Sequence, residues 1–309
     1  VEKAIQDGAI ADDSLAGQFE DKLGLCVPSF FPKLTRTAWG DEDRLADMAM
    51  GAMFASEMHP WPRGPLKLKG QRPSACGPKN GKPLRPYLQV DLRKLSEVAE
   101  CDAGSGVLQL WSDGGWGWLC VVPNREFRKN LLLPLKEDES QLFDKSRVSA
   151  YPNHHPYAYE ITAWKGAGIF VESLVRELRI AEEIEELTTG RRSPGCAAVR
   201  RLVRAAAGTW LGTVPAPSGD IRAFGFAESI QHFYTDWTAG DPSRFRQYTG
   251  GWRLLLQLYH RKIPWNFAEG TAWIFYRRRP RKPEKDPGPP RMSNICEHGA
   301  FQYVMCWER

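Results

Sequence analysis

The sequence predicts an α+β protein made of two similar antiparallel β units related by a pseudo-two-fold, with N-terminal and intervening helices. The main observation is an internal repeat. An apolar strand with one glutamine inside it is followed by a loop, a glycine and a second apolar strand, once around Gln89 and again around Gln257. Repetition at this spacing indicates that each copy is one folded unit. The second observation is apolar residues at helical spacing outside the two copies.

The first half of the chain is expected to begin with helices and to continue with strands. Apolar residues three and four apart indicate helices over 12–23 and 41–56, and the Pro-, Gly- and Lys-rich stretch after them is typical of a loop. The repeat then predicts a strand at 84–92, a helical turn at 95–98, and a hairpin of strands 107–111 and 116–122 across a glycine-rich turn.

The second half is expected to place helices before its strands. Residues 170–187 carry an apolar stripe with oppositely charged pairs on the other face, and residues 196–207 carry a second stripe. Strands follow at 252–258, 270–276 and 301–305. The expected division is an N-terminal helical extension, a first β half, a helical insertion and a second β half in one compact unit: 1–58, 59–165, 166–215 and 216–309.

Composition favours a cytoplasmic protein. The chain has 309 residues, a net charge of +5 and seven cysteines without a Cys-x-x-Cys pair, which indicates reduced thiols. No apolar run is long enough to span a membrane, and the N-terminus lacks the pattern of a signal peptide. The basic run at 277–283 lies in a proline-rich stretch and is interpreted as a surface loop, so neither a membrane nor a nucleic acid is expected as a partner.

Patterns for catalysis or metal binding are weak, so the expectation is a non-enzyme with no cofactor and no metal. A Gly-Ala-Gly at 166–168 and a lysine-rich loop at 77–82 each miss a position of the nucleotide-binding motifs that they resemble. The adjacent histidines at 154–155 would point apart in an extended chain. A zinc site would need a spacing that the candidate ligands do not show: Cys296, Glu297, His298, Cys306 and His260.

The repeated glutamine has a structural interpretation and a functional one. An amide inside an apolar strand must be hydrogen-bonded, so we expect it to bind backbone near the start of the neighbouring unit, in preference to a ligand. Twelve tryptophans are many, and most are expected in the core. Trp116, in a glycine-rich turn, is a candidate for an exposed ring at a protein interface.

The repeat resembles the YwqG-like domain family of bacteria, whose biochemical function is unassigned. The resemblance covers about 59–122 and 222–305. The residues that carry it are a Trp-Pro at Trp61, the strand around Gln89, a looser match leading to Gln231, and the closing strand around Gln257. The resemblance implies a fold but no reaction, and this chain departs from the family at its Gly-Gly elements, as a divergent member would.

The family context implies an immunity protein that binds a cognate secreted toxin, of the polymorphic or type VI-like kind, and blocks its active site in a heterodimer. Acidic residues would suit a basic nuclease toxin. The candidate partner-binding residues are, with Trp116, the acidic side chains Asp41, Glu42, Asp43, Glu182, Glu183 and Glu186. The alternative function is a small-ligand or carbohydrate-binding module that uses a cleft between the two β halves, lined by tryptophans and the glutamine pair.

Overall fold

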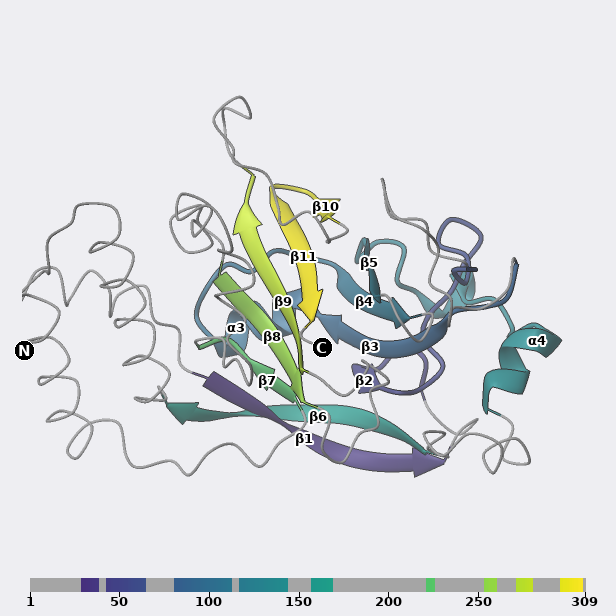
Figure 1. The fold of residues 1–309 in the computed structure, drawn as a ribbon, viewed down its shortest axis with the longest axis horizontal. Helices are drawn as coiled ribbons and strands as arrows, with labels where there is room; N and C mark the ends of the chain where they lie inside the picture. Colours follow the sequence, from purple (N-terminus) through teal and green to yellow (C-terminus); the bar gives the residue numbers. More distant parts are fainter. Residues whose placement is uncertain are drawn as a thin grey trace, which may run out of the picture.

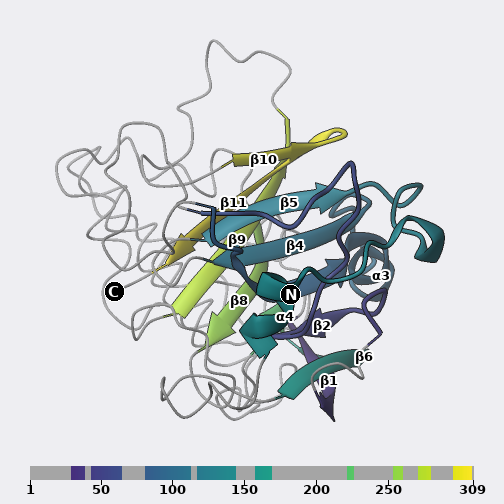
Figure 2. The ribbon, with the colours of Figure 1, turned by 90° about the vertical axis from the view of Figure 1, so that its right-hand side faces the viewer.

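The computed structural model shows one large antiparallel sheet (Figure 1). The structure describes residues 29–38, 43–64, 81–112, 117–143, 157–168, 221–225, 253–259, 271–279 and 295–307. Within these residues the sheet has eleven strands in the order β10-β11-β9-β8-β7-β1-β6-β2-β3-β4-β5. Its two edge strands, β5 and β10, lie against each other, so the sheet curls into a nearly closed, barrel-like form (Figure 2).

The strands of the N-terminal part run from β1 to β6. Their bounds are β1 (Ser29–Ala38), β2 (Met48–Ala49), β3 (Arg85–Asp91), β4 (Val107–Ser112), β5 (Gly117–Val122) and β6 (Tyr157–Gly168). The strands of the C-terminal part are β7 (Ile221–Ala223), β8 (Arg253–Tyr259), β9 (Thr271–Arg278), β10 (Ile295–His298) and β11 (Phe301–Trp307).

The predicted α+β class is wrong, because the described chain is mostly β and its helices are short. They are α3 (Leu92–Val98), which Asp91 caps by accepting a hydrogen bond from the Arg93 N–H, and α4 (Glu137–Ser140). Two 3-10 turns, Lys129–Leu131 and Gln141–Phe143, add little. β1 and β6 pair along their whole length and join both sets of strands into one sheet.

The helix expected at 41–56 is wrong over the part of it that the structure describes. Residues 43–56 form turns and the short strand β2, and Met50 has a positive φ of 63°, which an α-helix excludes. The N-terminal extension also contributes β1 to the middle of the sheet. The helices expected at 12–23, 170–187 and 196–207 lie outside the described residues, and β6 continues to Gly168, past the expected boundary at 165.

The repeat corresponds to matching positions on either side of the β1–β6 pair. In the order of the sheet, β2-β3-β4-β5 on one side stands opposite β7-β8-β9-β11 on the other. Both glutamine strands carry a bulge two residues before the glutamine, at Tyr87 in β3 and at Leu255 in β8. At each bulge the carbonyl accepts an N–H from a residue of positive φ, Met50 in one half and Phe224 in the other, at 2.9 Å.

One apolar core fills the inside of the curled sheet and is shared by both halves. Leu88, Val90 and Leu110 from the first half pack in the same cluster as Leu256 and Ile274 from the second. In β3, Leu88 and Val90 alternate with Gln89 and Asp91, whereas in β9 Ile274 stands between Trp273 and Phe275, which are buried on the other face of the sheet.

Three glycines of the first half receive side chains of the β10–β11 hairpin where the sheet closes. A Cβ at Gly104 would overlap the hydroxyl of Tyr303, and one at Gly117 would overlap the sulfur of Met305. A Cβ at Gly106 would lie 3.3 Å from Nε2 of His298. The Tyr303 hydroxyl then donates to the Ala103 carbonyl at 2.9 Å, which fixes the hairpin against the first half.

Candidate functional site

An outer layer covers the first half of the sheet and provides the best-defined surface of the described chain. It consists of two segments, 43–64 and 123–143, which lie over the outward-facing side chains of β3, β4 and β5. Phe54 is fully buried beneath it and its ring centroid lies 4.9 Å from that of Phe127. The two segments therefore form one packed layer.

Arg44 joins the two segments near their middle. Its guanidinium donates from Nη1 to the Leu133 carbonyl at 2.7 Å, and from Nη2 and Nε to the Met53 carbonyl at 2.9 and 3.1 Å. Leu133 also donates its N–H to the Ala55 carbonyl at 2.9 Å. A charged, three-bond donor of this kind holds the backbone of both segments in a fixed position.

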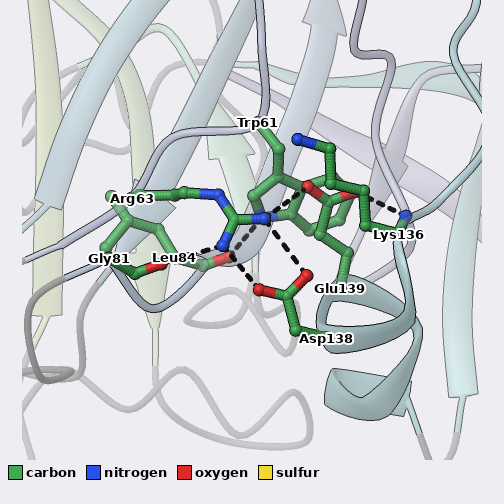
Figure 3. A network of polar contacts seen from close by, with 7 residues as sticks. All are labelled: Trp61, Arg63, Gly81, Leu84, Lys136, Asp138 and Glu139. Carbon is green, nitrogen blue, oxygen red and sulfur yellow. Dashed lines mark hydrogen bonds and ion pairs between the residues drawn. The ribbon is translucent and has the colours of Figure 1, made fainter.

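Arg63 joins the segments at one end of the layer (Figure 3). It donates to both carboxylate oxygens of Asp138, at 2.5 and 3.1 Å, and to Glu139 at 3.0 Å. Hydrogen bonding to Arg63 lowers the pKa of Asp138, and the Asp138 carboxylate raises the pKa of Arg63. The Glu139 carboxylate also accepts the Lys136 N–H at 2.9 Å, and this contact caps the N-terminus of α4.

A tight turn at 56–59 joins the segments at another point and projects a methionine. The Ser56 N–H donates to the His59 carbonyl at 2.9 Å, and the His59 N–H donates to the Ser56 hydroxyl at 3.1 Å. The His59 ring pairs with the Glu126 carboxylate at 2.6 Å. Between these anchors Met58 is 73 % exposed.

The electrostatics of the turn favour a charged carboxylate. Hydrogen bonding from His59, with help from Arg125 at 3.3 Å, lowers the pKa of Glu126. Burial lowers the pKa of His298 in β10. The charges of Glu126 and His59 act on the same imidazole, Glu126 raising its pKa and His59 lowering it. The imidazole of His298 is therefore neutral near pH 7, while Glu126 is ionised.

The thiols near this position are protonated. Burial raises the pKa of Cys296 to about 11 and raises the pKa of Cys120 further. A protonated, buried thiol is a poor nucleophile, so the closeness of Cys296 to His298 in the sequence does not make a catalytic pair. Among the described residues no group of three His, Cys, Asp or Glu side chains is arranged to hold a metal ion.

The structure describes four of the candidate partner-binding and repeat residues. Asp43 is exposed, and its carboxylate accepts the Leu45 N–H at 2.9 Å in a local turn. Trp61 is buried and donates to the Leu84 carbonyl at 2.8 Å. Gln89 and Gln257 are fully buried. The other candidates lie outside the described residues: Asp41, Glu42, Trp116, Glu182, Glu183, Glu186 and Gln231.

The Gln89 amide serves the outer layer and is not directed to an open cleft. Its nitrogen donates to the carbonyls of Ala46 and Arg44 at 2.8 and 3.1 Å, and its oxygen accepts the Phe54 N–H at 2.9 Å. Gln257 instead accepts a hydrogen bond from the buried guanidinium of Arg222. Trp111 and Trp273 are at most 1 % exposed, so these tryptophans and glutamines lie in the interior.

The residues that form the turn were not found by reading the sequence. Met58 and His59 are neighbours in the chain, but Glu126 lies 67 residues after His59. No motif spacing connects the three residues. One signal was present, since Met58 is a large apolar residue between Glu57 and His59, after the end of the expected helix 41–56.

Comparison with known proteins identifies no relative of this chain. No protein-family model matches the chain, and no curated protein matches it significantly.

Proposed function

We propose that this chain acts by binding another protein, and that the partner is a secreted toxin that it neutralises. The observation that carries the first part is the turn at 56–59, in which three polar contacts hold the backbone that carries the exposed Met58. A turn whose backbone is already fixed loses little backbone entropy on binding. Methionine also adapts its shape to a partner better than other apolar side chains do.

The identity of the partner as a toxin rests on the resemblance to the YwqG-like family. In this proposal the chain is an immunity protein of the bacterial cytoplasm, and it blocks the active site of the toxin by occupying it. The mechanism is steric and needs no cofactor. Of the described chain, no helix is long and apolar enough to cross a membrane.

The test is coexpression with the protein encoded next to this gene. The expected result is that the neighbour alone stops growth, that coexpression restores growth, and that the two proteins copurify as a heterodimer. An inactive variant of the same neighbour is the control for expression load. If the neighbour is toxic, both proteins accumulate in soluble form and growth is not restored, the proposal is wrong.

A further inference from the structure

We infer that the docking surface is the turn 56–59 together with the segment 123–131, here named the Met58 patch, and that it receives an acidic protein surface with an apolar centre. This inference rests on the proposed function and identifies the part of the molecule that performs it. The structure supports it by apolar exposure, by charge and by rigidity.

The apolar part of the patch comes from two adjacent segments. Met58 is 73 % exposed and Leu131 is 42 % exposed. The pairing of His59 with Glu126 at 2.6 Å and the hydrogen bond from the Leu133 N–H to the Ala55 carbonyl place their two segments side by side. Among the described residues one other large apolar side chain is exposed, Val98 on α3, at 37 %.

The charge of the patch is positive. Arg125, Arg128 and Lys129 are all exposed, and the side chain of Arg125 is 81 % exposed. The patch also contains two acidic residues: Glu126, whose carboxylate is engaged by His59 and Arg125, and the exposed Glu57 of the turn. The three cations outnumber the two carboxylates, and this excess favours an acidic surface over a basic one. The partner therefore differs from the basic nuclease that the acidic residues of the sequence suggested.

The rigidity of the patch comes from what lies beneath it. Phe127, within the segment, packs on Phe54 and on the cluster that contains Val107 and Val122 of the sheet. Arg44 fixes the backbone on both sides. The backbone of the patch is therefore expected to move little on binding, as in most pre-organised interfaces.

A protein fits the patch better than a nucleic acid does. Single-stranded nucleic acids need exposed aromatic rings on which bases stack. The exposed large apolar residues of the described chain are a methionine, a valine and a leucine. The rings of the layer are engaged below the surface, as in the packing of Trp61 against Trp111 with centroids 4.8 Å apart.

The experiment measures the affinity of the purified neighbouring protein, in its inactive form, for the full chain by titration calorimetry. Two variants change the patch, Met58→Asp and the double variant Arg128→Glu/Lys129→Glu. Controls on α3 are Val98→Asp, which makes the same apolar-to-acidic change as Met58→Asp, and Arg93→Glu, which reverses one charge where the double variant reverses two. Because all these residues are exposed, thermal unfolding is expected to be unchanged, and it is measured for each variant.

The expected result is at least a tenfold loss of affinity for each patch variant and less than a threefold change for each control. The affinity of the unchanged chain should fall with added salt, and the double variant should show a weaker salt dependence. If the unchanged chain binds and all four variants bind equally, the patch is not the docking surface, although the proposed function survives. If the unchanged chain does not bind its neighbour, the proposed function itself fails, and the inference with it. If the double variant loses only affinity for a single-stranded oligonucleotide, the patch is a nucleic-acid surface and the inference is overturned.

Discussion

At the scale of single residues, glycines determine how tightly the β10–β11 hairpin closes the sheet. Gly104 has a φ of 99°, and Tyr303 occupies the space of its missing Cβ. Gly81 has a φ of 78°, but a Cβ there would meet no atom within 4 Å. The two positions therefore separate the cost of backbone conformation from the cost of a clash.

Alanine at these two glycines should have different effects on stability. Gly81→Ala should reduce the free energy of unfolding by about 1 kcal/mol, because a positive φ is unfavourable for alanine. Gly104→Ala should lose about 2–4 kcal/mol, because the methyl group also displaces Tyr303. Urea denaturation measures both. Equal losses would show that Tyr303 does not pack into the place of the missing side chain.

The partly buried imidazole of His298 makes stability depend on pH. Burial lowers its pKa below the usual 6.5, so below that pH the unfolded chain takes up a proton more readily than the folded chain does. Glu126 acts in the same direction at lower pH, since its folded carboxylate also has a lowered pKa. The free energy of unfolding should therefore fall as the pH is lowered from about 7.5 to about 5.

Replacing the imidazole isolates its part of this dependence. His298→Gln should flatten the decline between about pH 7 and pH 5.5, where His298 titrates in the unfolded chain, and should leave the decline at lower pH. Denaturation curves recorded at several pH values give the slopes. An unchanged slope in the variant would mean that His298 is not the group responsible.

The pattern predicted that the repeated glutamine binds backbone near the start of the neighbouring unit. Gln89 binds backbone groups of residues 44–54, which belong to the expected N-terminal extension and not to the other β half. Gln257 accepts a hydrogen bond from the Arg222 side chain, and the sequence could not show this because Arg222 lies outside the strand pattern. Exposure of Met58 was also out of reach, since it depends on the fold of a loop.

At the scale of elements, strands with a long apolar run were predicted, and very short strands and those that pair far along the chain were not. The strands around both glutamines and the hairpin β4–β5 lie within one or two residues of their expected positions. β2 has two residues and β7 has three, which is too few to show a period. The alanines and methionines around β2 favour a helix by propensity, but pairing with β3 and β6 overrides it.

The strands β1 and β6 were missed for another reason. Pro28 immediately precedes β1 and Pro32 lies within it. In the sequence these two prolines indicated the end of a helix. Pro32 stands in a strand that pairs with β6 for ten residues, and a register shift follows it after Lys33. The pairing partner, β6, is distant in the chain, so no local pattern shows it.

The Arg63 contact gives a test of how α4 is held. Arg63→Lys keeps the positive charge but loses the two-pronged contact with Asp138 and the contact with Glu139, so the free energy of unfolding should fall by about 1–2 kcal/mol. Arg93→Lys is the matched control, since that arginine is 64 % exposed and its nearest carboxylates lie 3.9 and 4.0 Å away. Its effect should stay within about 0.5 kcal/mol. Chemical denaturation compares the two, and equal effects would show that the contact in Figure 3 does not stabilise the fold.

At the scale of the whole molecule, the repeat describes one sheet and not two domains. The inner face of each half is covered by the other half, through a single core that contains residues of β3, β4, β8 and β9. The sequence indicated the repeat but not this arrangement, because repetition shows that units are alike and does not show whether they share a core.

Hydrogen exchange of the native protein tests whether the two halves of the sheet share one core. Amides of β4 and β9 should exchange with the same free energy of opening and the same denaturant dependence, because both halves must unfold together. The Met58 patch depends on this closed sheet for its position. If the amides of β9 exchange several kcal/mol more easily than those of β4, the two halves fold separately and the account of a single sheet is wrong.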